Sequence, residues 1–252
     1  MPLLSLSHVS MAYHTLQGET PVLQDFSLDL SPGEFVALLG PSGCGKSTVL
    51  SLSAGLLRPD SGTILCHGIP VTAPPPHLGY MLQKDHLFPW LTVRENAALG
   101  LSVKGKPTKA QLSRIDGLLS ACGLSDFADS YPHQLSGGMR QRAALTRTLA
   151  VEPDLLLLDE PFSALDAQTR LKLADEVKAR ITEQKCATLL VTHDISEAIS
   201  MADRVVVFSR RPARILHEHS VALSGTPMER RHDNRFNTLF DTIWKEVECN
   251  VL

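Results

Sequence analysis

The chain has 252 residues, of which 43% are hydrophobic and 20% charged, values close to the averages of globular domains. Its 24 lysines and arginines and 27 aspartates and glutamates leave a net charge of −3, which argues against a protein that grips nucleic acid by charge alone. The five cysteines are odd in number and form no C-x-x-C pair. They therefore argue against a disulfide framework or a zinc site and fit a reduced cytosolic setting.

No segment has the character of a targeting or membrane-spanning sequence. The N-terminus lacks the charged start and apolar run of a signal peptide. No apolar stretch approaches the roughly 18 residues that a bilayer crossing needs. We therefore expect any link to a membrane to run through a partner.

The first part of the chain has β patterns. In residues 25–30, apolar side chains alternate with polar ones, which is the period of a half-buried strand. Residues 31–33 read Ser-Pro-Gly and predict a turn. Residues 35–39 are then apolar throughout, as in a strand that is covered on both faces.

Three later runs repeat this buried-strand character. Residues 155–158 end at Asp159 and Glu160, residues 188–191 end at Thr192 and His193, and a third run covers residues 205–208. Helical patterns lie between these runs, so the sequence predicts a parallel sheet. Open α/β sheets bind ligands at the carboxyl ends of their strands, where these polar residues stand.

Residues 84–150 contain no convincing strand pattern and several helix signals. Thr92 and Glu95 form a capping-box pattern that follows an apolar run. We therefore predict a mostly helical subdomain over residues 84–150, inserted into a larger domain of residues 1–225. The two core parts of that domain are then residues 1–83 and 151–225.

Residues 226–252 form a C-terminal tail with a predicted helix. Six apolar side chains recur there at helical spacing: Phe236, Leu239, Phe240, Ile243, Trp244 and Val247. Such a stripe is typical of a helix that packs on its own domain, and a dimer contact is the alternative.

A glycine-rich segment after the strand of residues 35–39 matches the pattern G-x-x-x-x-G-K-[ST]. Its residues are Gly40, Pro41, Ser42, Gly43, Cys44, Gly45, Lys46, Ser47 and Thr48. The glycines allow the backbone to aim its N–H groups at phosphate oxygens, and the following helix adds its positive end. Lys46 can reach the β- and γ-phosphates, and the Ser47 hydroxyl can ligate Mg²⁺. A chance glycine-rich turn is the alternative, but the position after a strand favours nucleotide binding.

The carboxylates that follow the strand of residues 155–158 supply the second part of a nucleotide site. Asp159 can hold Mg²⁺ through water, and Glu160 is placed to orient or deprotonate the attacking water. His193 ends another strand at the same edge. It is either a structural histidine or a hydrogen-bond donor to the γ-phosphate.

The segment Leu-Ser-Gly-Gly-Met-Arg-Gln-Arg over residues 135–142 is the most specific in the chain. Ser136 is a good helix N-cap, and Gly137 and Gly138 leave backbone N–H groups open to an anion. An ordinary capped helix is the alternative. Two glycines make a poor helix start without a ligand, so we predict a second phosphate site that has no lysine.

With these motifs in this order, the sequence resembles the ABC-type ATPases over residues 3–215. The resemblance implies a P-loop NTPase core of the α/β class with a mostly parallel sheet, an N-terminal antiparallel β part and an inserted helical subdomain. It also implies that Tyr13 stacks on adenine, that Gln83 senses Mg²⁺ and the attacking water, and that His193 is the switch histidine. Residues 163–166, which end at Asp166, match the loop that crosses to the other subunit. Because Glu160 is present, the resemblance implies ATP hydrolysis with Mg²⁺.

The resemblance further implies a head-to-tail dimer with a second copy of the chain. Each ATP would lie between residues 40–48 of one copy and residues 136–138 of the other, so that binding closes the pair and cleavage opens it. The expected partners are transmembrane permease subunits and, indirectly, a substrate-binding protein. The expected location is peripheral, at the cytoplasmic face of the inner membrane.

Two short stretches point to a subgroup of importers. Residues 87–96 (LFPWLTVREN) and residues 209–215 (SRRPARI) look like importers of nitrate, sulfonate, taurine and pyrimidine precursors. Phe88 and Trp90 are either ordinary core or part of a groove that accepts a short helix from a membrane subunit.

Two other functions compete with the importer ATPase. A soluble ABC-type ATPase that is not coupled to transport normally carries a coiled-coil insertion or two fused cassettes, and neither fits in 252 residues. A P-loop kinase or GTPase would not need the Ser136-Gly137-Gly138 segment. We therefore expect an ATP-driven importer subunit.

Overall fold

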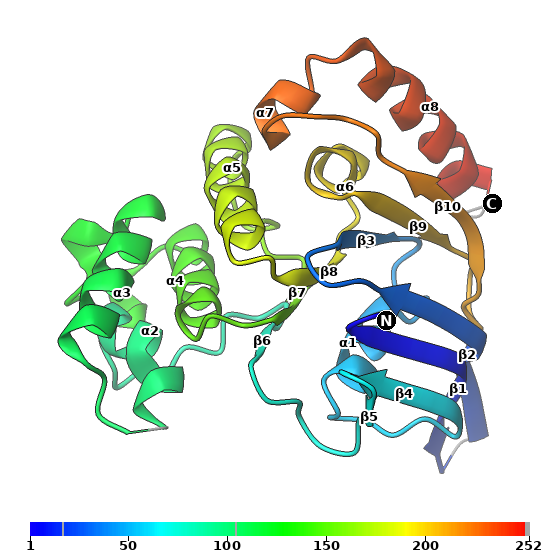
Figure 1. Ribbon diagram of the computed structural model, residues 1–252, viewed down its shortest axis with the longest axis horizontal. Helices are drawn as coiled ribbons and strands as arrows, with labels where there is room; N and C mark the ends of the chain where they lie inside the picture. The colour runs from blue at the N-terminus through cyan, green and yellow to red at the C-terminus, as the bar shows by residue number, and fades with distance from the viewer. Residues whose placement is uncertain (17, 104, 250–252) are drawn as a thin grey trace.

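The computed structural model describes residues 1–16, 18–103 and 105–249, and its central element is a six-stranded sheet (Figure 1). The strand order is β10-β9-β3-β8-β7-β6, in which only β10 runs antiparallel to its neighbour. The bounds are β3 Phe35–Leu39, β6 Leu78–Met81, β7 Leu155–Asp159, β8 Ala187–Val191, β9 Arg204–Phe208 and β10 Ile215–Ser220. Every residue of β3, β7 and β8 is buried, as their mostly apolar runs predicted.

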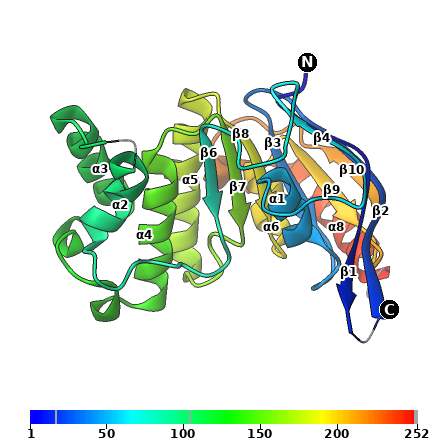
Figure 2. The same cartoon turned by 90° about the horizontal axis from the view of Figure 1, so that it is seen from below.

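A second, antiparallel sheet lies beside the first, in the order β2-β1-β4-β5. Its strands are β1 Leu4–Thr15, β2 Gly18–Leu30, β4 Ser61–Cys66 and β5 Ile69–Pro70. Helix α1 (Lys46–Ser53) follows β3 and buries Val49, Leu50 and Leu52 in one apolar cluster with strands of both sheets. This sandwiched position fixes the start of α1 at the carboxyl end of the parallel strands (Figure 2).

The helical part lies to one side of the parallel sheet (Figure 2). It contains α2 (Val93–Ser102), α3 (Lys109–Ala121) and α4 (Gly137–Ala150), with 3₁₀ turns at Ser125–Phe127 and Pro132–Gln134. The predicted capping box forms, because the Thr92 side chain accepts from the Glu95 N–H and the Glu95 carboxylate accepts from the Thr92 N–H. Helix α4 packs on α2, α3 and β6 and so joins this part to the sheet.

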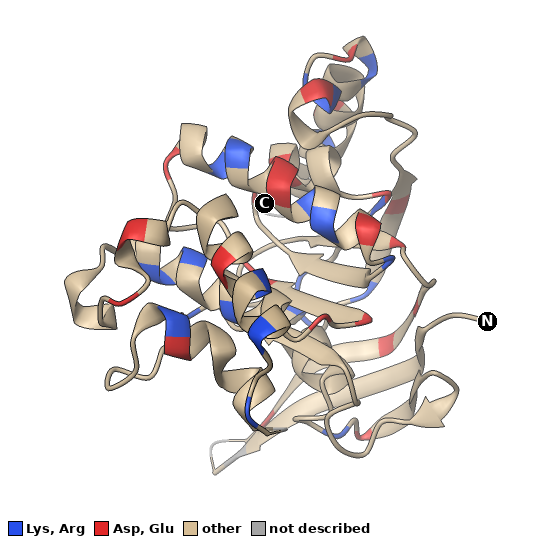
Figure 3. Ribbon diagram, turned by 60° about the vertical axis from the view of Figure 1, so that its left-hand side comes forward, with Lys and Arg blue, Asp and Glu red and all other residues tan. Residues whose placement is uncertain are grey.

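The predicted α/β class with a P-loop core, an antiparallel β part and inserted helices is confirmed. The proposed division at residues 83, 150 and 225 stays a prediction. Among the described residues, no helix combines the length and the apolar character that a membrane crossing needs. Acidic and basic positions are mixed over most of the helices, whereas α4 carries three arginines and no acidic residue (Figure 3).

The remaining helices are α5 (Ala167–Glu183), α6 (Ile195–Met201), α7 (Pro227–Arg230) and α8 (Asn234–Cys249). Of these, α6 packs on β3 and β9, α8 packs on β9 and α6, and α5 packs on α7. In α8, Phe236 and Ile243 are buried in the main apolar cluster, and Trp244 stays half exposed. The predicted tail helix therefore packs on its own domain.

Candidate nucleotide site

A cavity of about 250 Å³ opens at the carboxyl ends of the parallel strands. It collects side chains from segments far apart in the sequence, because β3, β7 and β8 are parallel neighbours. Its lining consists of Tyr13, Val22, Ser42, Gly43, Gly45, Lys46, Ser47, Thr48, Gln83, Glu160, Val191, His193 and Arg211. Most of the residues that the sequence assigned to the nucleotide therefore meet in one place.

The glycine-rich loop of residues 40–48 joins β3 to α1, as predicted. Gly43 has a φ of 73° and Gly45 a φ of 127°, a region that side chains rarely adopt. A Cβ atom on Gly45 would also lie 2.8 Å from the Val22 Cγ1 atom. Glycine at position 45 thus permits both the turn and the close approach of β2 behind the loop.

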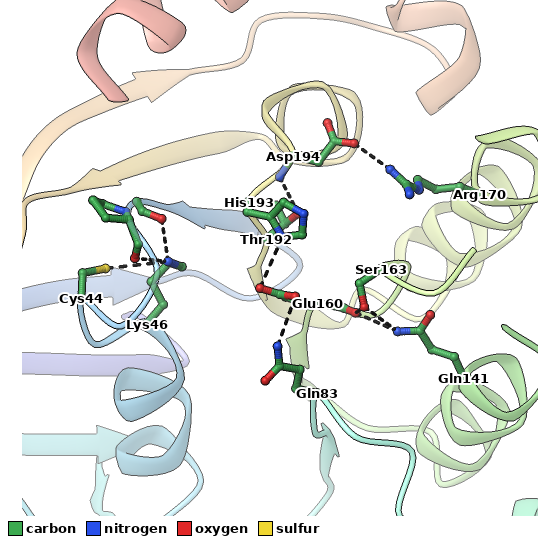
Figure 4. Close-up of polar contacts among 12 residues, drawn as sticks. Cys44, Lys46, Gln83, Gln141, Glu160, Ser163, Arg170, Thr192, His193 and Asp194 are labelled. Atoms are coloured by element: carbon green, nitrogen blue, oxygen red, sulfur yellow. Dashed lines mark hydrogen bonds and ion pairs between the residues drawn. The ribbon is translucent and has the colours of Figure 1, made fainter. Parts of the chain in front are cut away.

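Lys46 is almost fully buried and turns back onto its own loop. Its Nζ atom donates to the Gly40 carbonyl at 2.7 Å and to the Pro41 carbonyl at 2.9 Å, and lies 3.7 Å from the Cys44 Sγ atom (Figure 4). The ammonium is therefore held among neutral oxygens within the loop. A phosphate would replace these partners with a stronger, charge-assisted one.

Asp159 ends β7 and is 5% exposed. Burial raises the pKa of its carboxyl, and the neighbouring Glu160 raises it further, while a hydrogen bond from Ser47 and the charge of Lys46 act in the opposite direction. A cation bound nearby would stabilise the ionised form of this buried carboxyl group.

The oxygen donors Ser47, Asp159 and Gln83 fit Mg²⁺, which takes few protein ligands and completes its shell with water and phosphate oxygens. No cluster of three or more His, Cys, Asp or Glu side chains that could hold a metal ion occurs within residues 1–16, 18–103 and 105–249.

Glu160 lies at the centre of the polar contacts in the cavity (Figure 4). Its Oε2 atom accepts from the Gln83 Nε2 atom at 3.3 Å, and its Oε1 atom lies 3.3 Å from the His193 Nδ1 atom. The side chain of Glu160 is 21% exposed and that of His193 is 66% exposed. Gln83 and His193, the other two residues predicted to be catalytic, therefore both contact the Glu160 carboxylate, which remains open to water.

Tyr13, at the far end of β1, lines the same cavity. Its hydroxyl lies 3.3 Å from the Thr48 hydroxyl, and the residue is 42% exposed. This position leaves the ring accessible beside the loop. Stacking on adenine stays a prediction.

Eight predicted site residues do not line the cavity. Gly40, Pro41 and Cys44 belong to the loop beside it and Asp159 ends β7, whereas Ser136, Gly137, Gly138 and Asp166 lie at the starts of α4 and α5. Ser136 caps α4 and accepts from the Met139 N–H at 3.3 Å, with Gly137 and Gly138 in the first turn. Asp166 caps α5 and accepts from the Thr169 N–H at 2.9 Å and from its hydroxyl at 2.7 Å, which lowers the pKa of Asp166. A single chain therefore does not bring the starts of α4 and α5 to its own phosphate loop.

Sequence reasoning missed two side chains that hold the site. Arg211 donates to the Gly43 carbonyl from Nε at 3.0 Å and from Nη2 at 2.5 Å. Gln141 donates to the Glu160 carbonyl at 2.9 Å. Both residues belong to segments that the sequence analysis singled out, residues 209–215 and 135–142. Their hydrogen-bond partners are distant in the sequence, so no local pattern could predict them.

The chain is similar to known proteins over most of its length. A family model described as ABC transporter matches residues 23–163. An uncharacterized ABC transporter ATP-binding protein of Bacillus subtilis, YtlC, is 45% identical over 98% of this chain and 96% of its own. The aliphatic sulfonates import ATP-binding protein SsuB of Bacillus cereus is 43% identical over 99% and 97%. The nitrate import ATP-binding protein NrtD of Synechocystis is 40% identical over 91% and 87%.

A solved structure shares the fold. The dimeric post-hydrolysis state of the ATP-binding cassette MJ0796, bound to ADP and Pi, has a TM-score of 0.79 and 30% sequence identity. The match covers 86% of this chain and 98% of the cassette.

Proposed function

The chain belongs to the ABC transporter family and is an ATPase, and on this premise we propose that it powers the import of a solute by ATP-driven closure of a dimer. The observation that carries the proposal is the meeting of Lys46, Gln83, Glu160 and His193 at one cavity beside a phosphate loop. The alternative, an ABC-type ATPase that is not coupled to transport, is not favoured, because close relatives over nearly the whole chain are named as import subunits.

Binding begins at the loop of residues 40–48. The backbone N–H groups and the start of α1 attract phosphate, and Lys46 leaves the Gly40 and Pro41 carbonyls for the β- and γ-phosphates. Ser47, Gln83 and Asp159 would hold Mg²⁺, which when bound offsets the phosphate charge. Tyr13 contributes a ring surface to the base.

Hydrolysis is assigned to the contacts of Glu160. Its carboxylate orients the attacking water and takes up its proton. Gln83 holds one carboxylate oxygen at 3.3 Å, and His193 lies 3.3 Å from the other. From this position His193 can also donate to the γ-phosphate.

The second half of each site comes from another copy in this proposal. Ser136, Gly137 and Gly138 form a capped helix start that lies outside the cavity of their own chain. A γ-phosphate held by residues 40–48 would reach the open N–H groups of this helix start on the second copy. Asp166, in the loop that precedes α5, would face the same interface. Binding would then pull the copies together, and cleavage would release them.

Transport requires partners that this chain does not supply. We assign the contact with the transmembrane permease subunits to residues 83–92, which run from Gln83 to the cap of α2. Trp90 is 68% exposed there, so the alternative that it is ordinary core is wrong.

The chain would sit peripherally at the cytoplasmic face of the inner membrane. A substrate-binding protein would deliver the solute, and relatives that import sulfonates and nitrate favour a small anion.

Two substitutions test this function. Glu160→Gln should keep ATP affinity, lower turnover by at least about 100-fold and trap an ATP-dependent dimer, measured by light scattering. Lys46→Ala should raise the Kd for ATP by at least about tenfold, and Lys172→Ala, which removes an exposed lysine, is its control. A Glu160→Gln chain that hydrolyses ATP at the wild-type rate would contradict the catalytic role.

A further inference from the structure

One glutamine side chain joins α4 to the segment that carries the catalytic carboxylate. Gln141 lies on α4 and is 5% exposed. Its Nε2 atom donates to the Glu160 carbonyl at 2.9 Å and to the Ser163 hydroxyl at 3.1 Å (Figure 4). Its Oε1 atom accepts from the Ala164 N–H at 2.9 Å. Every polar function of this amide is thus directed at residues 160–164.

The backbone of Glu160 needs such support. Its φ of 50° lies in the left-handed region, which is strained for a residue with a side chain. Its N–H donates to the Val191 carbonyl at 2.8 Å, and its carbonyl accepts from Gln141 and, at 3.0 Å, from the Ser163 hydroxyl. Gln141 therefore contributes to fixing the direction of the Glu160 carboxylate without touching the carboxylate.

The first turn of α4 also contacts residues 160–164 directly, at Gly138. A Cβ atom on Gly138 would lie 3.1 Å from the Ala164 carbonyl oxygen, so the first turn of α4 is in close contact with the loop. Gln141 follows Gly138 by less than one helical turn. A shift of the α4 start must therefore move residues 160–164 or break the Gln141 hydrogen bonds.

We propose that Gln141 is a positioning residue that links the α4 start to the setting of Glu160 in the same chain. The inference rests on the proposed function, in which residues 136–138 engage the ATP held by the other copy. Engagement of that ATP would draw the α4 start into place, and Gln141 would pass this placement to the carboxylate that serves the chain's own ATP. The two sites of the dimer become coupled through one amide.

A purely structural glutamine would behave differently. Its removal would lower the free energy of unfolding and the amount of folded protein, because buried polar partners would lose their hydrogen bonds. The turnover of each folded molecule and its dependence on ATP would stay unchanged. Kinetics of the folded variant therefore separate the two roles.

The test compares Gln141→Glu with Thr148→Ala. Thr148 is a buried polar residue of the same helix, but its hydroxyl donates only within the helix, to the Ala144 carbonyl at 2.9 Å. In Gln141→Glu, an ionised carboxylate replaces the donor that faces the Glu160 carbonyl. We expect kcat to fall by about 10- to 100-fold, since small displacements of catalytic groups have effects of this size. The Kd for ATP should stay within about twofold of the control, and the Hill coefficient for ATP should fall toward that of independent sites.

The pH profile gives a readout that a structural role would not move. When the carboxyl introduced by Gln141→Glu is protonated, it regains a hydrogen-bond donor, so its kcat relative to wild type should recover as the pH falls. A relative kcat that is independent of pH and within about twofold of Thr148→Ala would overturn the proposal.

A second variant covers the case in which Gln141→Glu does not fold. Gln141→Met keeps the length of the side chain, adds no charge and removes both the donor to the Glu160 carbonyl and the acceptor for the Ala164 N–H, so kcat should fall by about threefold or more at unchanged Kd. An unchanged kcat contradicts the proposal. If the Glu160→Gln chain stays monomeric with ATP, the dimer and this coupling both fail. If that chain dimerises while Gln141→Glu turns over normally, only the coupling fails.

Discussion

Arg211 grips one carbonyl oxygen of the phosphate loop with two nitrogens of its guanidinium group. The segment that carries it is itself fixed to β2, because the Ala213 N–H donates to the Val22 carbonyl at 2.7 Å. Arg211 also lines the nucleotide cavity. The residue therefore braces the loop from outside and adds positive charge where phosphate is expected.

We expect Arg211→Ala to weaken ATP binding by about 3- to 30-fold, because charge-assisted hydrogen bonds to the loop are lost. Arg214→Ala is the matched control, since Arg214 belongs to the same segment but donates to the Gln24 side chain at 2.7 Å. Equilibrium binding of a fluorescent ATP analogue measures both. Equal affinities for the two variants would mean that Arg211 has no part in holding the loop.

Glu197 on α6 is a buried carboxyl whose proton affinity changes on folding. The pKa of Glu197 is raised from 4.5 to about 8, first by burial and then by the charge of Asp194, while the charge of Arg170 acts in the opposite direction. Between these pH values the folded chain keeps a proton that the unfolded chain has lost. The free energy of unfolding therefore falls as the pH rises from about 4.5 to about 8.

Glu197→Gln removes this titration and keeps the shape of the side chain. As the pH rises from about 5 to about 8, the free energy of unfolding of the variant should increase relative to that of wild type, by at most about 1.4 kcal/mol per pH unit. The Tm of the variant should rise relative to that of wild type over the same range. Thermal unfolding across this range measures the difference, and Glu176→Gln, at an exposed position of α5, gives the baseline for loss of a carboxylate. A Tm difference that does not change with pH would show that Glu197 is ionised in the folded chain.

At the scale of single residues, motifs predicted the groups whose chemistry is local. Lys46 and Ser47 follow from the glycine pattern, and Glu160 from its place at a strand end. Gln141 and Arg211 could not be predicted in this way, because their partners lie 19 and 168 positions away in the sequence. Only the fold brings those pairs together.

At the scale of elements, the loop before α2 is held rigidly while its aromatic side chains face outward. The fully buried Asn96 amide donates to the carbonyls of Phe88, Leu91 and Thr92 and accepts from the Phe88 N–H at 2.8 Å. Trp90 packs edge-on against Phe88 at 5.2 Å between ring centroids. A fixed loop with an exposed tryptophan suits a docking surface, since little order is lost on binding.

Trp90→Ala should therefore weaken association with the permease subunits by about tenfold or more. Its effect on the free energy of unfolding should stay within about 0.5 kcal/mol, because the side chain is mostly exposed. Co-purification with the membrane subunits measures the first effect and urea unfolding the second. Trp244→Ala removes another exposed tryptophan, on α8, and should leave association intact.

The elements that the sequence predicted well are those with the strongest burial pattern. The runs 35–39 and 155–158 are apolar throughout, the run 188–191 contains one polar residue, Thr188, and each became a fully buried strand. Strand β10 was not predicted, because it is an edge strand of sequence Ile-Leu-His-Glu-His-Ser that is mostly exposed and carries no alternation. Pairing with β9, and not its own pattern, makes it a strand.

At the scale of the whole molecule, the lysine-bearing loop and the glycine-rich helix start do not face one cavity within one chain. If the sites form head to tail between two copies, defects in the two halves should complement one another. Gly137 is the position at which to break the helix-start half. A Cβ atom there would meet no atom closer than Arg140 Nη2 at 4.0 Å, whereas one on Gly138 would press on the Ala164 carbonyl.

Gly137→Asp should thus fold normally, because an acidic residue suits the first turn of a helix, while its charge repels the γ-phosphate. Neither this variant nor Lys46→Ala should hydrolyse ATP alone. In an equal mixture, about half of the dimers contain one chain of each kind, and each mixed dimer has one intact site. ATP turnover should then exceed that of both parents and reach its maximum at equal amounts.

Mixing Lys46→Ala with Glu160→Gln provides the control, because both substitutions damage the same half of the site. Every dimer in that mixture has a defective residue on the loop side of both sites, so turnover should not recover. Recovery in the first mixture but not in the second requires that each ATP be enclosed by two chains. If neither mixture recovers activity although the dimers form and exchange subunits, each chain must complete its nucleotide site alone. Residues 136–138 would then have to move to the cavity of their own chain.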